Sequence, residues 1–485
     1  MPDSPPGGRT IDGPSSTSLE SKNKSLVQLA RNSSSSIADA IPDQYGPNVQ
    51  EGQPDAITSD STQEIDIFEV AWDNDGADPL SEFHNRRVFS VLGLSAYVLG
   101  IGIGPMFLGP LSEFYGRRPL YLLSWTAYLL WQIPQAASNH IAISLVFRFL
   151  SGFSGSTFFT VPGAPMALFS IAPFLGLSLG PLIGGFINYN VDWRWIYYVL
   201  IIWVFALWWC IFFLVLETYH PILLKQKARR LRKERNDDRF FAPIEKVKRS
   251  VLRAIAMSSA RPFQLLAFEP MCLTLSLFSA LLLGILYLFF GTFPLIFGTT
   301  YGFNQWQSGL AFIGIMISML FGVATDPIWR RIRVYLIEKH DRETGVENIS
   351  EPEFRLPPAI LGSLLVPIGL FMFAWTSRPW IHWIVPIIGS AIFGAGNALI
   401  LTGIFTFLVE AYPVYAASTL AANSFVRNLF AAGLPLFGNQ MYTKMGYQWA
   451  SSLIAFLTLA LMPLPYIFLI YGKKIRAKSR HARRY

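Results

Sequence analysis

The sequence predicts an all-α integral membrane protein built from two similar halves, and three observations carry this prediction. Of the 485 residues, 52% are hydrophobic and only 14% are charged, whereas a soluble chain carries about 25% charged residues. The apolar residues stand in blocks of about 20, the length that crosses roughly 30 Å of hydrocarbon as a helix. One sequence pattern also occurs twice, about half a chain apart. This composition excludes a water-soluble enzyme.

The first 87 residues differ from the remainder of the chain. They contain 15 Asp and Glu against 6 Lys and Arg, with scattered Pro and Gly and no long apolar run. Such a segment buries too little apolar surface to offset chain entropy. We expect a disordered acidic tail over 1–87, without the apolar region of a signal peptide.

Eleven apolar blocks follow the tail and predict eleven membrane-spanning helices. Five form an N-terminal bundle over 88–216 and six form a C-terminal bundle over 266–472. A basic linker, 217–265, separates the bundles with 13 Lys and Arg against 5 Asp and Glu, and a basic tail, 473–485, ends the chain. The predicted spans are 88–110, 120–138, 141–161, 166–187, 193–216, 270–297, 304–325, 357–376, 382–409, 416–438 and 449–471.

The connections between the spans carry very unequal charge. If 111–119, 217–265, 326–356 and the C-terminus face one side, that side holds 28 Lys and Arg and the other holds three. The positive-inside rule makes the first side cytoplasmic. Because the basic C-terminal run lacks interleaved aromatic residues and adjoins a span, we expect it to meet anionic lipid and not nucleic acid.

A ten-residue pattern ends the first span and the seventh. It consists of a glycine, an acid four residues later, and two arginines eight and nine residues later. Glycine permits close helix approach, the acid ends the span, and the arginines pair with the acid and with helix C-terminal carbonyls. The two copies are Gly109, Glu113, Arg117 and Arg118, and Gly322, Asp326, Arg330 and Arg331.

The offset between the copies is 213 residues, as expected for a transporter with parallel halves. Two spans reach the pattern in the second half, but only one reaches it in the first. By this internal symmetry the chain lacks its first transmembrane helix.

Three stretches carry a family resemblance. Gly109 to Arg118, with Gly116 inside it, resembles the signature of the major facilitator superfamily, and Arg148 to Gly152 resembles the arginine motif of its fourth helix. The third stretch resembles the glycine-proline motif of helix five in the proton-antiporter branch and contains Gly176, Gly180, Pro181, Gly184 and Gly185. Over about 88–475 the chain is similar to fungal multidrug and polyamine antiporters of the twelve-helix drug:proton group.

The resemblance implies the major facilitator fold and secondary active transport by alternating access. It implies export of small amphipathic or cationic compounds, such as drugs, toxins, secondary metabolites or polyamines, in exchange for protons. We expect a monomer in the plasma membrane, or alternatively the vacuolar membrane, with no cofactor and no metal. The sequence has no Walker loop, paired metal-ligand histidines or nucleophile elbow that would indicate an enzyme.

The chain departs from the family pattern in its missing first helix and in the short connection Pro162–Pro165 between helices four and five. With eleven spans the N-terminus would lie outside, where Asn23 and Asn32 become usable glycosylation sequons. An alternative interpretation is therefore a truncated, non-transporting relative, from a degenerate gene or an incomplete gene model.

Arg148 lies about 10 Å inside its span, where a buried charge costs at least ~2.5 kcal/mol. We expect it to face the bundle interior, either as a proton-coupling or substrate-orienting charge or as a structural lock. The acid and arginines of each repeat copy form either a cytoplasmic gate or ordinary topology-setting charge. The Gly176–Gly185 stretch is either a bendable helix or a close-packing surface.

Four further residues are candidates for substrate or proton contacts. Glu269 and Glu410 flank spans of the second half, where they either attract a cationic substrate or remain solvated. Arg427 lies inside a span. Tyr287 either lines the cavity or packs in the core.

Overall fold

The computed structural model describes most of the chain after the acidic tail. The described residues are 87–138, 140–159, 166–192, 194–217, 219–235, 241–242, 251–345 and 351–479. The predicted tail up to residue 86, its sequons at Asn23 and Asn32, and the connection Pro162–Pro165 lie outside these ranges.

Each predicted apolar block corresponds to helix, and the described residues contain no strand. The N-terminal half consists of α3 (Arg87–Tyr115), α4 (Arg117–Ala137), α5 (Ile141–Gly155) with η2 (Ser156–Phe159), α6 (Met166–Asn190) and α7 (Arg194–Leu214). The C-terminal half consists of α11 (Pro270–Tyr301), α12 (Gln305–Ala324), α14 (Pro357–Thr376), α15 (Ile384–Ala411), η4 (Pro413–Tyr415), α16 (Ala416–Met445), α17 (Tyr447–Leu461) and α18 (Leu464–Lys478).

Eight helical segments of the described chain are long and apolar enough to cross a membrane, compared with the eleven spans predicted. The helices α4, α6 and α16 occupy the other three predicted spans and are not among the eight. Two of them carry buried polar residues, which lower their mean hydropathy: α4 has Gln132 and Gln135, and α16 has Asn423 and Arg427.

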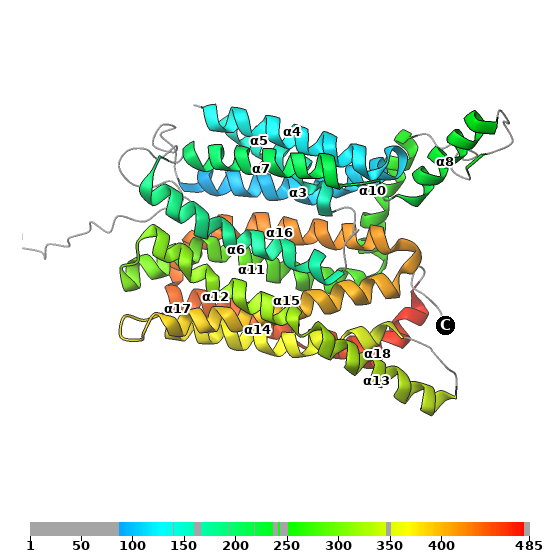
Figure 1. The fold of residues 1–485 in the computed structure, drawn as a ribbon. Coiled ribbons are helices and arrows are strands. Elements are labelled where there is room, and N and C mark those ends of the chain that lie inside the picture. The colour runs from blue at the N-terminus through cyan, green and yellow to red at the C-terminus, as the bar shows by residue number, and fades with distance from the viewer. Residues whose placement is uncertain are drawn as a thin grey trace, which may run out of the picture. The chain divides into compact units, whose positions relative to one another are not determined.

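The basic connections contain helices that we do not predict from the sequence. The predicted linker 217–265 contains α8 (His220–Arg235) and most of α10 (Val251–Phe268), and 326–356 contains α13 (Asp326–Thr344) and η3 (Pro352–Arg355). Figure 1 shows α8, α13 and α18 at one end of the helices. We name this the basic end.

Local sequence signals explain where the helices of the second half begin and end. Proline begins both α11 and α14, where its fixed φ and missing N–H suit the first turn. Gly302 ends α11 in the left-handed conformation, with φ of 68°. Asn304 and Gln307 then form a capping box that starts α12.

Helices pack against one another both within each half and between the halves. In the N-terminal half α5 packs against α3 and α4, and α7 packs against α4. In the C-terminal half α15 packs between α14 and α12, while α11 packs against α16. The halves meet mainly where α3 crosses α16 and where α6 crosses α12.

The enclosed core lies around α11. Of its most apolar window, 78% is buried, compared with 17% for α7. Phe289 and Phe293 of α11 contact Phe373 of α14, and Phe289 also contacts Phe393 of α15. Polar groups on α11 and its neighbours are therefore shielded from lipid, whereas α7 exposes aromatic residues such as Trp203.

Candidate functional site

Arg148 of α5 turns toward neighbouring helices, as its position in a span predicts. Its Nη2 donates a hydrogen bond to the Tyr197 hydroxyl of α7 at 2.9 Å. Its guanidinium also lies against Gly93 of α3, where a Cβ would come within 2.9 Å of Nη1. A side chain at position 93 would therefore make the end of the Arg148 side chain shift.

Tyrosines continue the polar contacts inside the N-terminal half. Tyr128 of α4 interacts with Tyr97 of α3 and with Gln132. Tyr97 is in turn within electrostatic reach of Tyr287 on α11, in the other half. Polar groups therefore extend from the N-terminal bundle to its junction with the C-terminal bundle.

The first copy of the repeated pattern forms a turn that is held by a residue outside the pattern. Gly116 has φ of 95° and starts α4. The Glu217 carboxylate, just after α7, accepts hydrogen bonds from the backbone N–H groups of Arg117 and Arg118 at 3.1 and 3.2 Å. A carboxylate at a helix N-terminus is stabilised by the helix dipole, so Glu217 joins the exit of α7 to the start of α4.

The arginine side chains of this copy also contact the exit of α7. Arg118 Nη2 donates to the Phe212 carbonyl at 3.0 Å, and Arg117 lies over the Tyr219 ring at 5.6 Å. The expected pairing with a helix C-terminal carbonyl is thus present. The expected close contact at Gly109 is absent, because a Cβ there would meet nothing within 4 Å. The side chain of Glu113 lies outside the description.

Removing Glu217 tests this turn. Glu217→Ala is expected to lower the free energy of unfolding by about 0.5–2 kcal/mol, since the start of α4 loses its cap. The measurement is chemical unfolding of the purified protein in detergent. Glu234→Ala, which removes an exposed pair with Arg230, is the control and is expected to cost less than about 0.5 kcal/mol. Equal losses would show that Glu217 does not hold the turn.

The second copy of the pattern differs from the first. A Cβ at Gly322 would lie 3.1 Å from the Ala398 side chain, so this glycine does bring α12 close to α15. Asp326 starts α13 and pairs with Arg330 one turn later at 2.7 Å, with the arginine 70% exposed. An exposed pair within one helix contributes little, and it joins no two elements.

The glycine-proline stretch of α6 makes two close contacts with α12. A Cβ at Gly185 would lie 3.0 Å from the Gln305 carbonyl of α12, and a Cβ at Gly309 would lie 2.6 Å from the Pro181 carbonyl. The other glycines of the stretch make no such approach. A Cβ at Gly176, Gly180 or Gly184 would meet nothing within 4 Å.

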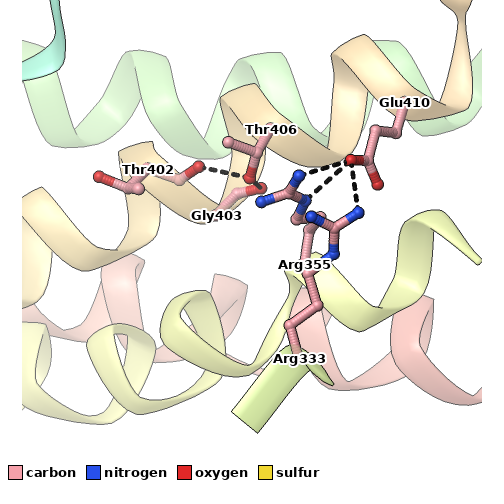
Figure 2. Close-up of polar contacts among 6 residues, drawn as sticks. All are labelled: Arg333, Arg355, Thr402, Gly403, Thr406 and Glu410. Atoms are coloured by element: carbon pink, nitrogen blue, oxygen red, sulfur yellow. Dashed lines mark hydrogen bonds and ion pairs between the residues drawn. The ribbon is translucent and has the colours of Figure 1, made fainter. Parts of the chain in front are cut away.

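Glu410, at the end of α15, is the centre of a charged cluster at the basic end. Its Oε1 accepts a hydrogen bond from Arg333 of α13 at 3.0 Å and two from Arg355 of η3, at 2.9 and 2.7 Å (Figure 2). Two arginines therefore already neutralise this carboxylate.

Glu269 also lies at the basic end, immediately before α11. It is only 2% exposed, and its Oε2 accepts a hydrogen bond from the buried Tyr412 hydroxyl at 3.1 Å. Burial and the neighbouring Glu269 both raise the pKa of Tyr412, which keeps the hydroxyl protonated as a donor. Glu269 thus fastens the start of α11 to the end of α15.

A buried ion pair lies beside the Glu410 cluster and was not predicted from the sequence. Arg476 of α18 binds Glu353 of η3 through two hydrogen bonds of 2.8 Å, and the two side chains are 3% and 5% exposed. Lys473 pairs with Glu351 at 2.7 Å. The sequence does contain a signal for this pairing, because 351–355 holds acidic residues and 473–476 holds basic residues. Their positions in the sequence do not show, however, that the two segments meet in the fold.

Arg427 and Tyr287 lie deeper, where α16 packs against α11. Arg427 is 8% exposed and Tyr287 is 7% exposed. The Arg427 guanidinium lies over the Phe405 ring of α15 at 5.0 Å. Electrostatic interaction couples Arg427 to Tyr287. These two predicted residues are therefore neighbours, while Glu269 and Glu410 lie at the helix ends.

Comparison with known sequences gives a consistent result. The sequence profile described as Major Facilitator Superfamily matches residues 80–433. The efflux pump atB of Aspergillus terreus is 49% identical over 472 residues, which cover 94% of this chain and 99% of that protein. The probable drug/proton antiporter YHK8 of Saccharomyces cerevisiae is 40% identical over 433 residues, which cover 86% of this chain and 83% of that protein.

Among solved structures, the human organic anion transporter MFSD10 (TETRAN) matches with a TM-score of 0.55 and 17% identity. The match covers 83% of this chain and 88% of that chain. At this identity the likeness concerns the fold alone.

Proposed function

The chain belongs to the major facilitator superfamily, and from that premise we propose that it exports small amphipathic organic compounds in exchange for protons. It is a multi-pass integral membrane transporter of the efflux type and not an enzyme. The likeness to a probable drug/proton antiporter supports the proton exchange.

Arg148 is the observation on which the proposed coupling rests. It is a permanent charge inside α5, hydrogen-bonded to Tyr197 and lying against Gly93 of α3. A charge placed in this way on α5 contacts two neighbouring helices of the same half, α3 and α7. Protonation or substrate binding near it can therefore bias the position of the whole half.

The polar contacts fit a mechanism in which the halves rock as units. Glu217, Glu410 and Glu353 each fasten elements of one half at the basic end. Between the halves the described hydrogen bonds are sparse, for example Ser95 Oγ to the Ala432 carbonyl at 2.6 Å and Asn188 to Gln305 at 3.1 Å. Charged contacts within the halves and few side-chain hydrogen bonds between them suit alternating access.

The basic end faces the cytoplasm in this proposal, because basic loops are retained there. We place the transporter in the plasma membrane as a monomer. The first copy of the repeated pattern then lies at the cytoplasmic side as part of the gate. Its arginines contact the exit of α7 within their own half.

Proton-driven export tests the proposal. In vesicles with an imposed pH gradient, the chain is expected to export members of a panel of amphipathic anions, cations and neutral compounds. Arg148→Ala is expected to reduce this export by about tenfold or more, since a charged hydrogen bond is worth about 1.5–3 kcal/mol.

The control is Arg378→Ala. Arg378 itself lies outside the spans, and its guanidinium lies over the rings of Trp375 and Trp380. This replacement is expected to leave export unchanged. Export that ignores the pH gradient would exclude proton exchange, and equal export by Arg148→Ala would exclude its coupling role. No export of any compound would favour the truncated, non-transporting relative.

A further inference from the structure

The charges inside the predicted spans all have the same sign. Apart from Glu113 and Glu410, which lie in the last turns of α3 and α15, the sequences of the spanning helices contain no Asp or Glu. Away from the helix ends, they contain Arg148 and Arg427. Inside the bilayer the bundle therefore carries positive charge without any acidic side chain to balance it.

Arg427 is the less satisfied of the two arginines. It is the twelfth residue of the 30-residue helix α16, so it lies about 16 Å from the start of that helix. Its Nε is buried and has no hydrogen-bond partner. Among the described residues its guanidinium takes part in no ion pair, and its contact is the face of Phe405 at 5.0 Å. A buried cation without a carboxylate or other hydrogen-bonded partner is costly to maintain in a membrane.

The neighbours of Arg427 form surroundings that suit a flat organic molecule. Phe405 of α15 offers an aromatic face, and Tyr287 of α11 offers a ring with a hydroxyl. The next residue, Asn428, contacts Gly102 of α3 so closely that a Cβ at Gly102 would lie 2.9 Å from the Asn428 Cβ. Arg427 is thus beside the crossing of α16 and α3, where the two halves meet and where alternating access would open.

A cationic substrate finds no counter-ion at this depth. The two carboxylates that the sequence suggested for this purpose are engaged elsewhere: Glu410 accepts from Arg333 and Arg355, and Glu269 accepts from Tyr412. Both also lie at helix ends. An arginine next to an aromatic ring is suited to a carboxylate or phenolate joined to an aromatic body, since the guanidinium fork binds two oxygens.

We propose that the transported compounds are small aromatic organic anions, whose acidic oxygens pair with Arg427 while their rings pack beside Phe405 and Tyr287. This inference rests on the proposed export function and narrows its substrate class. Binding of the anion neutralises the unpaired guanidinium. The movement of the two halves around the site therefore costs less free energy when the anion is bound than when the site is empty.

The experiment uses the full-length chain in vesicles with an imposed pH gradient and matched pairs of probes. Fluorescein and rhodamine 123 share the xanthene ring system but carry opposite charge, and 2-naphthoate and 2-naphthamide differ in one ionisable group. Export of fluorescein and 2-naphthoate is expected, with little export of rhodamine 123 and 2-naphthamide. Arg427→Gln is expected to lower export of both anions by about tenfold or more, as loss of a charged hydrogen bond predicts.

Two variants separate binding from folding. Arg427→Lys keeps the charge without the planar fork and is expected to retain more anion export than Arg427→Gln. Arg378→Gln removes another arginine that stacks on aromatic rings, outside the spans, and is expected to export normally. Thermal unfolding with and without fluorescein provides a second readout, with stabilisation in the wild type and none in Arg427→Gln.

The outcomes distinguish this inference from the proposed function. Export of rhodamine 123 or 2-naphthamide without the anions would overturn the anion assignment and leave gradient-driven export intact. Equal anion export by wild type and Arg427→Gln would exclude Arg427 as the anion partner. If no probe is exported and none stabilises the protein, both proposals fail. The comparison of anionic probes with cationic and neutral probes uses only the wild-type protein. It therefore tests the substrate class even if Arg427→Gln does not fold.

Discussion

Replacing Arg476 by alanine is expected to destabilise the C-terminal half by about 3–5 kcal/mol, the usual cost of stranding one partner of a buried ion pair. Arg476 and Glu353 are almost fully enclosed and share two hydrogen bonds of 2.8 Å. Once the guanidinium is gone, the Glu353 carboxylate stays buried between η3 and α18 without a counter-ion. Water can reach it only if α18 moves away.

The chain offers a matched control one turn earlier on the same helix. Lys473 pairs with Glu351 of the same connection at 2.7 Å, but the lysine is 68% exposed. Lys473→Ala is therefore expected to cost less than about 1 kcal/mol. The measurement is chemical unfolding of each purified variant in detergent, followed by tryptophan fluorescence.

A double replacement shows whether charge or shape holds α18 in place. Glu353→Leu combined with Arg476→Met removes both charges and keeps similar volume, so it is expected to recover most of the loss. Gly472 supports the prediction, because a Cβ there would lie 2.5 Å from Glu353 Oε1, which shows how tightly the carboxylate is enclosed. Similar losses for Arg476→Ala and Lys473→Ala would contradict the assignment.

The helices themselves were largely predictable from apolar block length. The block 357–376 coincides with α14, Pro357–Thr376, because a proline pair starts it and the apolar run simply ends. The last block, 449–471, is predicted as one span, and Tyr447–Ala477 is one candidate membrane span of the structure, within which α17 and α18 meet at Met462 and Pro463. Proline cannot continue the hydrogen-bond ladder of a helix, so the sequence did contain this signal.

The basic connections were harder to predict because their charge hides their helical periodicity. Residues 217–265 were treated as a linker by composition, yet Ile222 and Ala228 of α8 are buried. These two buried apolar residues are six positions apart and stand among seven Lys and Arg. Composition alone therefore does not indicate that this segment has a buried helix face. The helix α8 is nevertheless rich in Lys, Arg, Leu and Gln, which favour helix, so propensity and not periodicity carried the signal for it.

The candidate site was predictable in its residues but not in its pairings. Arg148, Arg427 and Tyr287 stood out because charged or polar groups inside spans are costly. Their partners depend on which helices cross. Arg148 donates a hydrogen bond to Tyr197, whereas Arg427 lies over the Phe405 ring and pairs with no acid among the described residues. Sequence spacing also cannot show that Glu410 is paired twice.

Placing a side chain at Gly152 is expected to prevent α3 and α5 from packing, the second large effect that the structure predicts. A Cβ at Gly152 would overlap the Tyr97 carbonyl, and a Cβ at Gly100 would overlap the Phe149 carbonyl. The obstacles are backbone atoms on both sides, which cannot turn away as a flexible side chain can. Gly152 closes the arginine motif, so this contact also fixes the position of Arg148 four residues earlier.

Gly152→Ala is expected to cost about 1–3 kcal/mol through overpacking, and Gly152→Leu is expected to leave no folded protein in detergent extracts. Gly155→Ala on the same helix is the matched control, since its Cβ would lie 3.4 Å from the Tyr128 ring, an ordinary contact. Alanine is favoured over glycine in helices by about 0.5–1 kcal/mol, so this control should be neutral or stabilising. Opposite signs for two glycine replacements three residues apart can arise only if backbone approach, and not helix propensity, decides the outcome. Equal stability of Gly152→Ala and Gly155→Ala would mean that α3 and α5 cross less closely than the structure has them.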